Sequence, residues 1–387
     1  VVNFLVLGYF KYWSHFAALL SGAWAASTPS ALGLVMPLGI SFYTFQIISY
    51  LVDVYRRETK AEKSLISLGT YLCMFPQLIA GPIVNYHLIQ EQLHKRKHSM
   101  VKVESGLKVF ALGLAYKVLL ANRVGHLWTE VTAIGYESIS TPLAWMSIVA
   151  YSLQLYFDFY GYSLMAIGLG RMMGFDFPQN FNNPYMAVSM TDFWRRWHMT
   201  LGGWFREYVY IPLGGNRVSK AKWFRNIFIV WLLTGLWHGA AWTFILWGLF
   251  FAVFLTAEKL WYGEALAQTR FLKHLYVLLL IAVSFVIFDA ASVSDAFRTI
   301  GSLFGLGGLP RSDALARYYF DSYSGVFLVA IVGATPLPAK IVRQFSEDGP
   351  GKKIMSVVEP VVLLALLAVV TAYLVDGSFN PFLYFRF

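Results

Sequence analysis

The chain has 387 residues, of which 57% are hydrophobic and 13% are charged, and its formal net charge is +10. Because a soluble domain carries roughly a quarter charged residues, this composition excludes an ordinary soluble protein and indicates an integral membrane protein. The basic residues stand between apolar runs, as in cytoplasmic loops beside acidic lipids, and this distribution disfavours nucleic-acid binding. The single cysteine, Cys73, excludes an intrachain disulfide.

We expect one membrane domain over residues 1–387, with an incomplete first span. Residues 1–10 look like the end of a spanning helix, and no signal peptide is visible before them. Pro37 suits the first turn of the next helix, which is predicted to run to Asp53. The segment Arg56–Lys63 follows with four basic residues, and we predict that it lies in the cytoplasm.

A long run without Asp, Glu, Lys or Arg follows, at residues 64–90. Pro76, Gly81 and Pro82 interrupt it, which argues against one straight helix. We therefore predict a helix to Phe75 and then irregular chain, which a membrane protein tolerates where other protein covers it or where it lines a cavity.

The segment 138–170 holds one full charge, Asp158, within the aromatic sequence Y-F-D-F-Y-G-Y-S. Two interpretations stay open at this point. Asp158 is either a buried structural acid paired with an arginine or a tyrosine, or a carboxylate that orients a catalytic group.

Residues 171–225 combine polar, basic and aromatic side chains. Ser189 followed by Asp192 is typical of a capping box, and the helix that it would open reads D-F-W-R-R-W-H-M-T-L. At helical spacing, one face of this interfacial amphipathic helix carries the histidine and its apolar neighbours: Trp194, Trp197, His198 and Leu201.

The same region holds seven basic residues from Arg195 to Arg225, more than any other loop. They either anchor the protein to acidic lipids or bind a donor that carries phosphates, since guanidinium groups match phosphate geometry. For the second interpretation, the candidate donor-binding residues are Arg195, Arg196, Arg206 and Arg217.

Residues 227–257 again contain no Asp, Glu, Lys or Arg. At about 1.5 Å per residue, one helix of this length would span about 46 Å, whereas the hydrocarbon core of a bilayer is about 30 Å thick. We predict a break at G-L-W-H-G, Gly235–Gly239, because glycine adopts backbone angles that other residues avoid. His238 is the only strongly polar ionisable side chain in this run, which makes it a functional candidate at membrane depth.

Further spans are predicted at residues 275–288, 322–339 and 361–374, so that we expect about nine spanning or re-entrant segments in all. The distribution of basic residues predicts which loops lie on each side of the membrane. The predicted cytoplasmic segments are 56–63, 95–102 and 195–225, and the predicted external segments are 123–142 and 290–311.

The sequence contains no H-E-x-x-H, no paired cysteines, no phosphate loop and no G-x-S-x-G, so it indicates no metal site, no NTPase and no serine hydrolase of that type. Two histidines packed among tryptophans remain, His198 and His238. A neutral imidazole is suited to act as a general base. For His198 alone, a structural ring and a catalytic partner are both open, and the other six histidines are expected to have surface roles.

At these residues the chain resembles the membrane-bound O-acyltransferases. The paired signature is D-F-W-R-R-W-H and G-L-W-H-G-A, and further matches are P-L-G-I-S-F-Y-T-F-Q, F-P-Q-L-I-A-G-P-I-V, P-x-N-F-N-N-P-Y and the terminal N-P-F-L-Y-F-R-F. The forms R-R-W-H and P-L-G-G-N-R resemble the AlgI-like alginate and peptidoglycan O-acetyltransferase branch more than the teichoic acid D-alanyl branch. Gly202-Gly203 departs from the branch pattern and leaves the local helix geometry open.

The resemblance implies an all-α, polytopic transmembrane bundle with re-entrant and interfacial helices around a central funnel or tunnel. It implies that His238 is the catalytic histidine and His198 the second, less universal one. Our own interpretation adds Asp158, Trp194, Trp197 and Trp237 as possible support for these two histidines.

The implied donor is acetyl-CoA or another acyl thioester from the cytoplasm, with no permanently bound cofactor. The implied acceptor is a hydroxyl outside, on a polysaccharide or on an SGNH-type partner protein that acetylates it, and the implied location is the bacterial plasma (inner) membrane. The alternative reaction is D-alanyl or other acyl transfer to teichoic acid. The alternatives of another class are a transporter, disfavoured because no internal repeat is visible, and a non-catalytic scaffold of a polysaccharide-modifying complex.

Overall fold

The computed structural model describes residues 2–20, 37, 39–79, 81–306, 308–347, 350–377 and 382–383. In this part of the chain all regular elements are helical and no β-strand occurs, which confirms the predicted all-α fold. The loop expected at Ser27–Ser30 and most of the terminal N-P-F-L-Y-F-R-F lie outside the described residues.

The α-helices in chain order are α1 (Val2–Leu20), α2 (Ile40–Tyr55), α3 (Leu65–Cys73), α4 (Phe75–Leu78), α5 (Tyr86–His94), α6 (Met100–Ala115), α7 (Asn122–Ile134), α8 (Thr141–Met172), α9 (Met190–Trp194), α10 (Met199–Phe205), α11 (Lys220–His238), α12 (Trp242–Ala257), α13 (Gly263–Gln268), α14 (Leu272–Asp289), α15 (Val293–Leu303), α16 (Ala314–Gly333), α17 (Leu337–Glu347) and α18 (Pro350–Asp376). Three π-helical turns directly follow α6, α10 and α12, at Tyr116–Ala121, Arg206–Tyr210 and Glu258–Tyr262.

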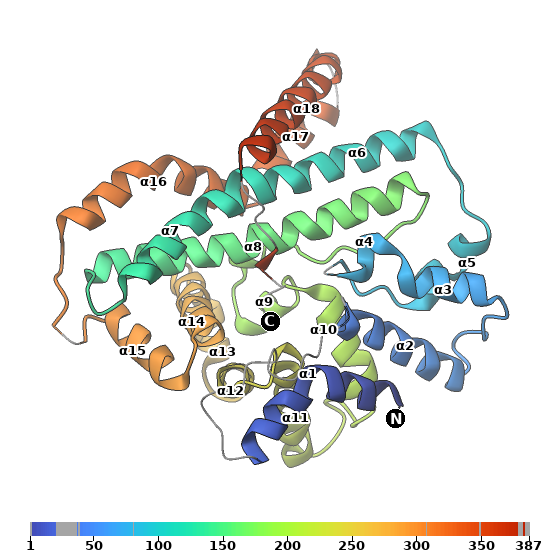
Figure 1. Ribbon diagram of the computed structural model, residues 1–387, viewed down its shortest axis with the longest axis horizontal. Helices are drawn as coiled ribbons and strands as arrows, with labels where there is room; N and C mark the ends of the chain where they lie inside the picture. Colours follow the sequence, from blue (N-terminus) through green and yellow to red (C-terminus); the bar gives the residue numbers. More distant parts are fainter. Residues whose placement is uncertain are drawn as a thin grey trace.

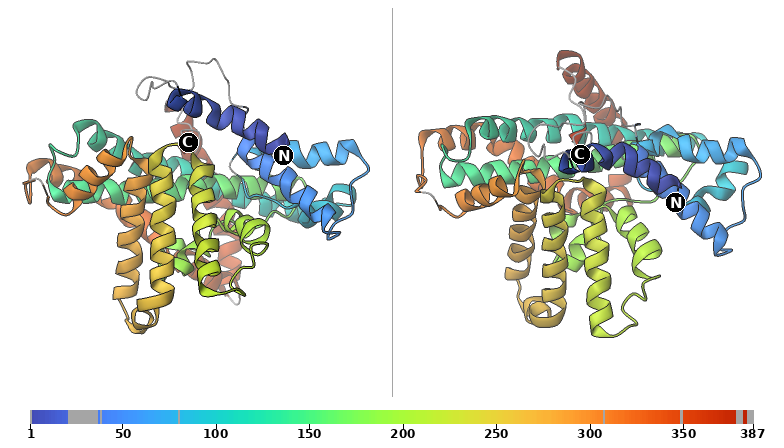
Figure 2. Two further views of the ribbon diagram at one scale, coloured as in Figure 1. Left: turned by 90° about the horizontal axis from the view of Figure 1, so that it is seen from below. Right: turned by 60° about the horizontal axis from the view of Figure 1, so that its bottom comes forward.

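Two groups of helices cross steeply in the molecule. The long helix α8 lies beside α6 and α7 along the longest axis (Figure 1). Helices α11, α12 and α14 run together across these three (Figure 2). The main hydrophobic core forms where the two groups meet, because it contains side chains of α8, α12 and α14. The candidate site lies in this core.

Glycines allow α6 and α8 to approach closely. A Cβ added at Gly161 would lie 2.6 Å from the carbonyl oxygen of Gly113, and one at Gly168 would lie 2.5 Å from that of Gly106. Small residues at such contacts let two backbones come together where a larger side chain would separate them.

We predict that Gly161→Ala destabilises the protein although alanine is the better helix former. The added methyl meets the backbone of α6, which cannot move aside, and overpacking of this kind costs about 1–3 kcal/mol. Gly325→Ala in α16 is the matched control, because no atom lies within 4 Å of its added Cβ. Thermal unfolding in detergent should show a lower Tm for Gly161→Ala and an unchanged or higher Tm for Gly325→Ala. Equal melting temperatures would contradict the proposed role of the close contact.

Asp158 joins α8 to the segment between α6 and α7. Its carboxylate forms an ion pair with Lys117 at 2.5 Å and accepts a hydrogen bond from the backbone N–H of Leu383 at 2.8 Å. Lys117 lies in the π-helical turn Tyr116–Ala121 and points inward to this carboxylate. Asp158 therefore has a structural partner, and that partner is a lysine rather than the expected arginine or tyrosine.

Three of the described helical stretches are long and apolar enough to cross a membrane, namely Trp242–Gln268, Leu272–Asp289 and Gly351–Asp376. A fourth results if the bent pair Ala314–Gly333 and Leu337–Ser346 is one span. This is fewer than the expected nine segments. One reason is that helices such as α3 and α4 are short. The helix predicted to reach Phe75 ends at Cys73, and Pro76 lies in the first turn of α4, where irregular chain was predicted; irregular chain follows at Gly81 and Pro82.

Ion pairs and hydrogen bonds join several of the loops, whose sides of the membrane stay a prediction. Glu62 of the segment 56–63 forms an ion pair with His94, just before the segment 95–102, at 2.8 Å, and Lys102 forms one with Asp176 at 2.8 Å. A hydrogen bond from Tyr86 lowers the pKa of Glu62 to about 2, and its carboxylate is therefore ionised at neutral pH. The two segments predicted to lie outside also meet, because Ser302 Oγ donates to the carbonyl of Tyr136 at 3.3 Å.

Candidate active site

The predicted break in residues 227–257 is confirmed at the glycine after His238. Helix α11 ends at His238, Gly239 is extended, and α12 begins at Trp242. A Cβ on Gly239 would lie 2.5 Å from the ring of Phe244, so glycine is required here for packing rather than for an unusual φ angle. The hairpin of α11 and α12 also closes through Gly235, because a Cβ there would lie 2.4 Å from the carbonyl oxygen of Phe244.

The ring of His238 is buried in an aromatic shell. Its centroid lies 4.9 Å from Trp237, 5.0 Å from Trp247 and 5.0 Å from Phe288. The side chain is 7% exposed. Three uncharged aromatic rings therefore fix the position of the imidazole.

Two side chains of α1 bind the last turn of α11. Lys11 Nζ donates to the carbonyl of Trp237 and lies over its ring, and Tyr12 Oη donates to the carbonyl of Leu236 at 2.6 Å. The last carbonyls of a helix have no partner within the helix, so these contacts hold the helix end that carries His238. The sequence contains no motif that would have pointed to Lys11 or Tyr12.

His198 is held in an unusual backbone conformation by its neighbours. Its φ is +43°, and its Nδ1 lies 3.1 Å from Asn180 Oδ1. The backbone N–H of Thr200 also donates to this Asn180 oxygen, at 3.3 Å, which identifies the atom as an acceptor. The Nδ1 of His198 therefore carries the proton, and Nε2 presents a lone pair. Nε2 is buried and has no hydrogen-bond partner among the described residues.

The helix predicted over D-F-W-R-R-W-H-M-T-L is wrong as one continuous element. The capping bond of Ser189 Oγ with the N–H of Asp192 is confirmed at 2.9 Å, but α9 ends at Trp194 and α10 begins only at Met199. Residues of the loop that precedes α9 form hydrogen bonds with backbone groups that a continuous helix would have used. Asn182 donates its N–H to the carbonyl of Arg196, and the carbonyl of Asn180 accepts from the N–H of Met199, each at 2.9 Å.

The residues expected on one helix face nevertheless line one cavity. A cavity of about 30 Å³ lies between the two histidines, with room for about two water-sized groups. Its wall includes Trp194, Trp197, His198, Leu201, His238 and Trp247. The indole Nε1 atoms of Trp194 and Trp247 are buried and have no hydrogen-bond partner in the described part of the chain.

A larger pocket of about 380 Å³ adjoins the histidine cavity. Trp194, His198 and Leu201 line both spaces, and Arg195 and Arg206 line the larger one. Gly202 and Gly203 lie on the wall of this pocket. Both are in regular helix α10, so the local helix geometry is undisturbed at these two glycines.

The other two predicted donor-binding arginines lie elsewhere. Arg196 forms an ion pair with Asp192 at 2.9 Å, and Arg217 is an exposed residue of the turn after Gly214. Neither is among the residues that line the pocket of about 380 Å³. Only Arg195 and Arg206 are therefore brought next to the histidine cavity.

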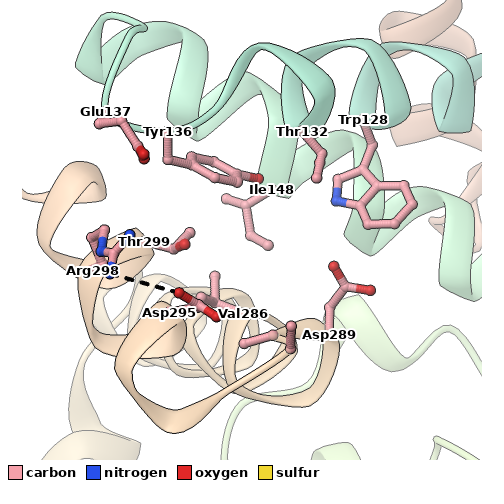
Figure 3. A pocket seen from close by; sticks show the side chains of 12 residues that line it. Trp128, Thr132, Tyr136, Glu137, Ile148, Val286, Asp289, Asp295, Arg298 and Thr299 are labelled. Atoms are coloured by element: carbon pink, nitrogen blue, oxygen red, sulfur yellow. Dashed lines mark ion pairs between the residues drawn. The ribbon is translucent and has the colours of Figure 1, made fainter. Parts of the chain in front are cut away.

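A third cavity, of about 350 Å³, lies beside the same C-terminal end of α14 as the histidine cavity. Trp128 and Asp289 face each other across it, and Asp295 pairs with Arg298 at its edge (Figure 3). On α14, Val286 and Asp289 line this cavity while Phe285 and Phe288 line the histidine cavity. Neighbouring residues of a helix point about 100° apart, so the two spaces lie on different faces of the same turn of α14.

Comparisons with known proteins agree with the pattern of the site. The model of the membrane-bound O-acyltransferase family (MBOAT) matches residues 56–294. The chain is 35% identical over 418 residues to the probable alginate O-acetylase AlgI of Azotobacter vinelandii, and the match covers 100% of this chain and 83% of the relative. It is 36% identical over 344 residues to the peptidoglycan O-acetyltransferase of Helicobacter pylori, covering 80% of this chain and 64% of that protein.

A more distant similarity is 31% identity over 235 residues to the teichoic acid D-alanyltransferase of Bacillus subtilis, covering 58% of this chain and 59% of that protein. The chain therefore belongs to the membrane-bound O-acyltransferase family, in its AlgI-like O-acetyltransferase branch.

Proposed function

We propose that this multi-pass membrane O-acyltransferase moves an acetyl group from acetyl-CoA, or a related thioester, to a hydroxyl in the cavity between His198 and His238. The observation that carries the proposal is that one small cavity joins both histidines and shares three wall residues with a larger pocket that holds Arg195 and Arg206. The thioester would enter through the larger pocket, with its phosphates at the arginines and its acetyl group at the histidines.

The proposed step balances without a cofactor. His238 takes the proton of the acceptor hydroxyl, the hydroxyl oxygen attacks the thioester carbonyl, and the carbon–sulfur bond breaks. The thiolate leaves and receives the proton from His238, so that the products are an acetyl ester and a thiol. Because the attacking hydroxyl gives its single proton to His238, His198 accepts a hydrogen bond at Nε2 from a second hydroxyl of the acceptor or from a water and so positions the acceptor. Asn180 fixes the tautomer of His198.

The size and chemistry of the cavity favour acetyl over D-alanyl. Room for about two water-sized groups suits a carbonyl and a methyl group better than an amino acid. The wall consists of aromatic and aliphatic side chains and the two histidines, and no described lining residue is a carboxylate that would pair with an ammonium group.

The acceptor is proposed to arrive at another face of the C-terminal turn of α14, through the cavity of about 350 Å³ that Trp128 and Asp289 line. An aromatic ring with carboxylates and a guanidinium group around it offers one apolar surface and several hydrogen-bonding groups, which suits a saccharide or a partner's hydroxyl-bearing loop. The names of the relatives support a polysaccharide acceptor. An SGNH-type partner protein and a location in the bacterial inner membrane complete the proposal.

Membrane vesicles of defined orientation test both the reaction and its direction. We expect inside-out vesicles that contain the protein to transfer labelled acetyl from added acetyl-CoA to a hydroxyl acceptor, because acetyl-CoA does not cross the membrane and the Arg195–Arg206 face would be outermost. Sealed right-side-out vesicles should not. Transfer only in right-side-out vesicles would reverse the proposed orientation, and no transfer in either would favour a transporter or a scaffold.

A matched pair of arginine variants tests the donor pocket. We predict that Arg206→Ala raises the KM for the acyl donor several-fold with a smaller change in kcat, because a contact made equally in the ground state and the transition state affects KM. Arg217→Ala is the control, since Arg217 is equally exposed, belongs to the same basic segment and is not among the residues that line the pocket. Equal effects of the two substitutions would indicate lipid anchoring instead.

A further inference from the structure

Three carboxylates converge between the end of α2 and the π-helical turn Arg206–Tyr210, on residues that line neither of the two adjoining pockets at the histidines. Asp53, Glu58 and Glu207 each offer an oxygen, and these atoms all lie within 4.8 Å of one another. Asp53 is 1% exposed, Glu207 is half-buried and Glu58 is exposed. Like charges at this separation repel strongly where water is partly excluded, so the group requires a positive counter-charge.

The surrounding residues supply little of that charge. Tyr208 Oη donates to Asp53 Oδ1 at 2.8 Å, and Asn85 Nδ2 donates to Glu207 Oε2 at 3.4 Å. His87 Nδ1 lies 3.5 Å from Asp53 Oδ2, which is longer than the 2.7–2.9 Å or so of a charge-assisted hydrogen bond. In the described ranges, no lysine or arginine forms an ion pair with any of the three carboxylates.

Two buried oxygens, one of them in this group, are left without a hydrogen-bond partner among the described residues. One is Asp53 Oδ2 and the other is Thr59 Oγ1. Thr59 lies next to Asp53, because its backbone N–H donates to the carbonyl of Asp53 at 3.3 Å. Buried polar atoms are nearly always satisfied, so a cation coordinated by several oxygens would account for the unpartnered Asp53 Oδ2 and would offset the repulsion.

We propose that Asp53, Glu58 and Glu207 bind a hard divalent cation, Ca²⁺ or Mg²⁺, with water completing its coordination. Both ions prefer carboxylate and other oxygen ligands. The carboxylates come from the end of α2, from the loop after it and from the turn at Arg206–Tyr210. A bound cation would therefore hold α2 against the turn that also carries Arg206 and Tyr210, two residues of the larger pocket's wall. Cation binding does not depend on the proposed reaction.

Luminescence of Tb³⁺ tests this site on the full chain in detergent. Tb³⁺ occupies oxygen-rich Ca²⁺ sites, and a nearby tyrosine sensitises its emission; Tyr208 contacts Asp53 directly. We expect saturable emission on excitation of the aromatic residues, displaced by Ca²⁺ or Mg²⁺. Glu58→Gln and Glu207→Gln should each weaken Tb³⁺ binding at least tenfold, and Ca²⁺ or Mg²⁺ should raise the Tm of the wild type more than that of either variant.

Glu91→Gln is the matched control, because Glu91 is an exposed carboxylate of α5 outside the group, and it should leave emission and Tm shift unchanged. Asp53 is buried, so Asp53→Asn could prevent folding and is not used as the test. Glu58 is exposed, so Glu58→Gln should fold. Emission that is unsaturable, or equal in the wild type, Glu58→Gln and Glu207→Gln, would overturn the proposal. Neither Tb³⁺ emission nor the Tm shift measures acetyl transfer. A negative result here would therefore contradict the cation site and leave the proposed function untouched.

Discussion

His238→Ala should abolish acetyl transfer while the protein keeps its helical fold. The imidazole is the only strong acid or base in residues 227–257, and it lines a cavity of about 30 Å³ together with His198. Loss of a general base typically costs about 10²–10⁴-fold in rate, which would leave activity near background. The measurement is labelled acetyl transfer at matched protein concentration, with circular dichroism and Tm as folding controls.

A second substitution separates catalysis from packing at the same position. If His238 only fills the aromatic shell of Trp237, Trp247 and Phe288, His238→Gln should retain activity and lower the Tm. If it is the base, His238→Gln should be as inactive as His238→Ala. Near-normal transfer by a well-folded His238→Ala protein would exclude the catalytic assignment.

Trp194→Phe should lower kcat about 10²–10³-fold, the usual cost of removing one hydrogen-bond donor to a developing oxyanion. The indole N–H of Trp194 is buried without a hydrogen-bond partner in the described part of the chain. It lines both the larger pocket and the histidine cavity, where the thioester carbonyl would lie. Phenylalanine keeps an aromatic ring against Trp231 and Phe251 and removes the donor.

The kinetic pattern distinguishes this role from a packing effect. A donor that acts mainly in the transition state lowers kcat with little change in KM. Trp223→Phe is the control, since this buried tryptophan contacts Lys259 and lines neither cavity. An unchanged kcat in Trp194→Phe would shift the assignment to Trp247, whose N–H is also unpaired among the described residues.

Local chemistry in the sequence determined the features that depend on neighbouring residues. Composition determined the membrane class, because apolar surface in such excess is stable only in lipid or a large core. Two prolines and a glycine indicated that the run at 64–90 is interrupted, although the first break comes at Met74, before Pro76. Ser189 with Asp192 determined the start of α9. The run at 227–257 was too long for one span, and it breaks at Gly239 as predicted.

Tertiary structure alone decided the features that depend on residues far apart in the chain. Asn180 and Asn182 take backbone groups that a helix through Arg196 and His198 would have needed, so the predicted helix is broken although its residues still share one cavity. Asp158 pairs with Lys117, 41 positions away in the chain (158 − 117).

Tertiary structure also decided which of the predicted donor-binding arginines line the pocket. Four of them looked equivalent in sequence, yet Arg195 and Arg206 line the pocket while Arg196 pairs with Asp192. Carboxylates at positions 53, 58 and 207 form one group although no spacing connects them. The physical reason is common to all these cases: hydrogen bonds and ion pairs between distant segments outweigh local helix propensity, and the sequence carries no periodicity that records them.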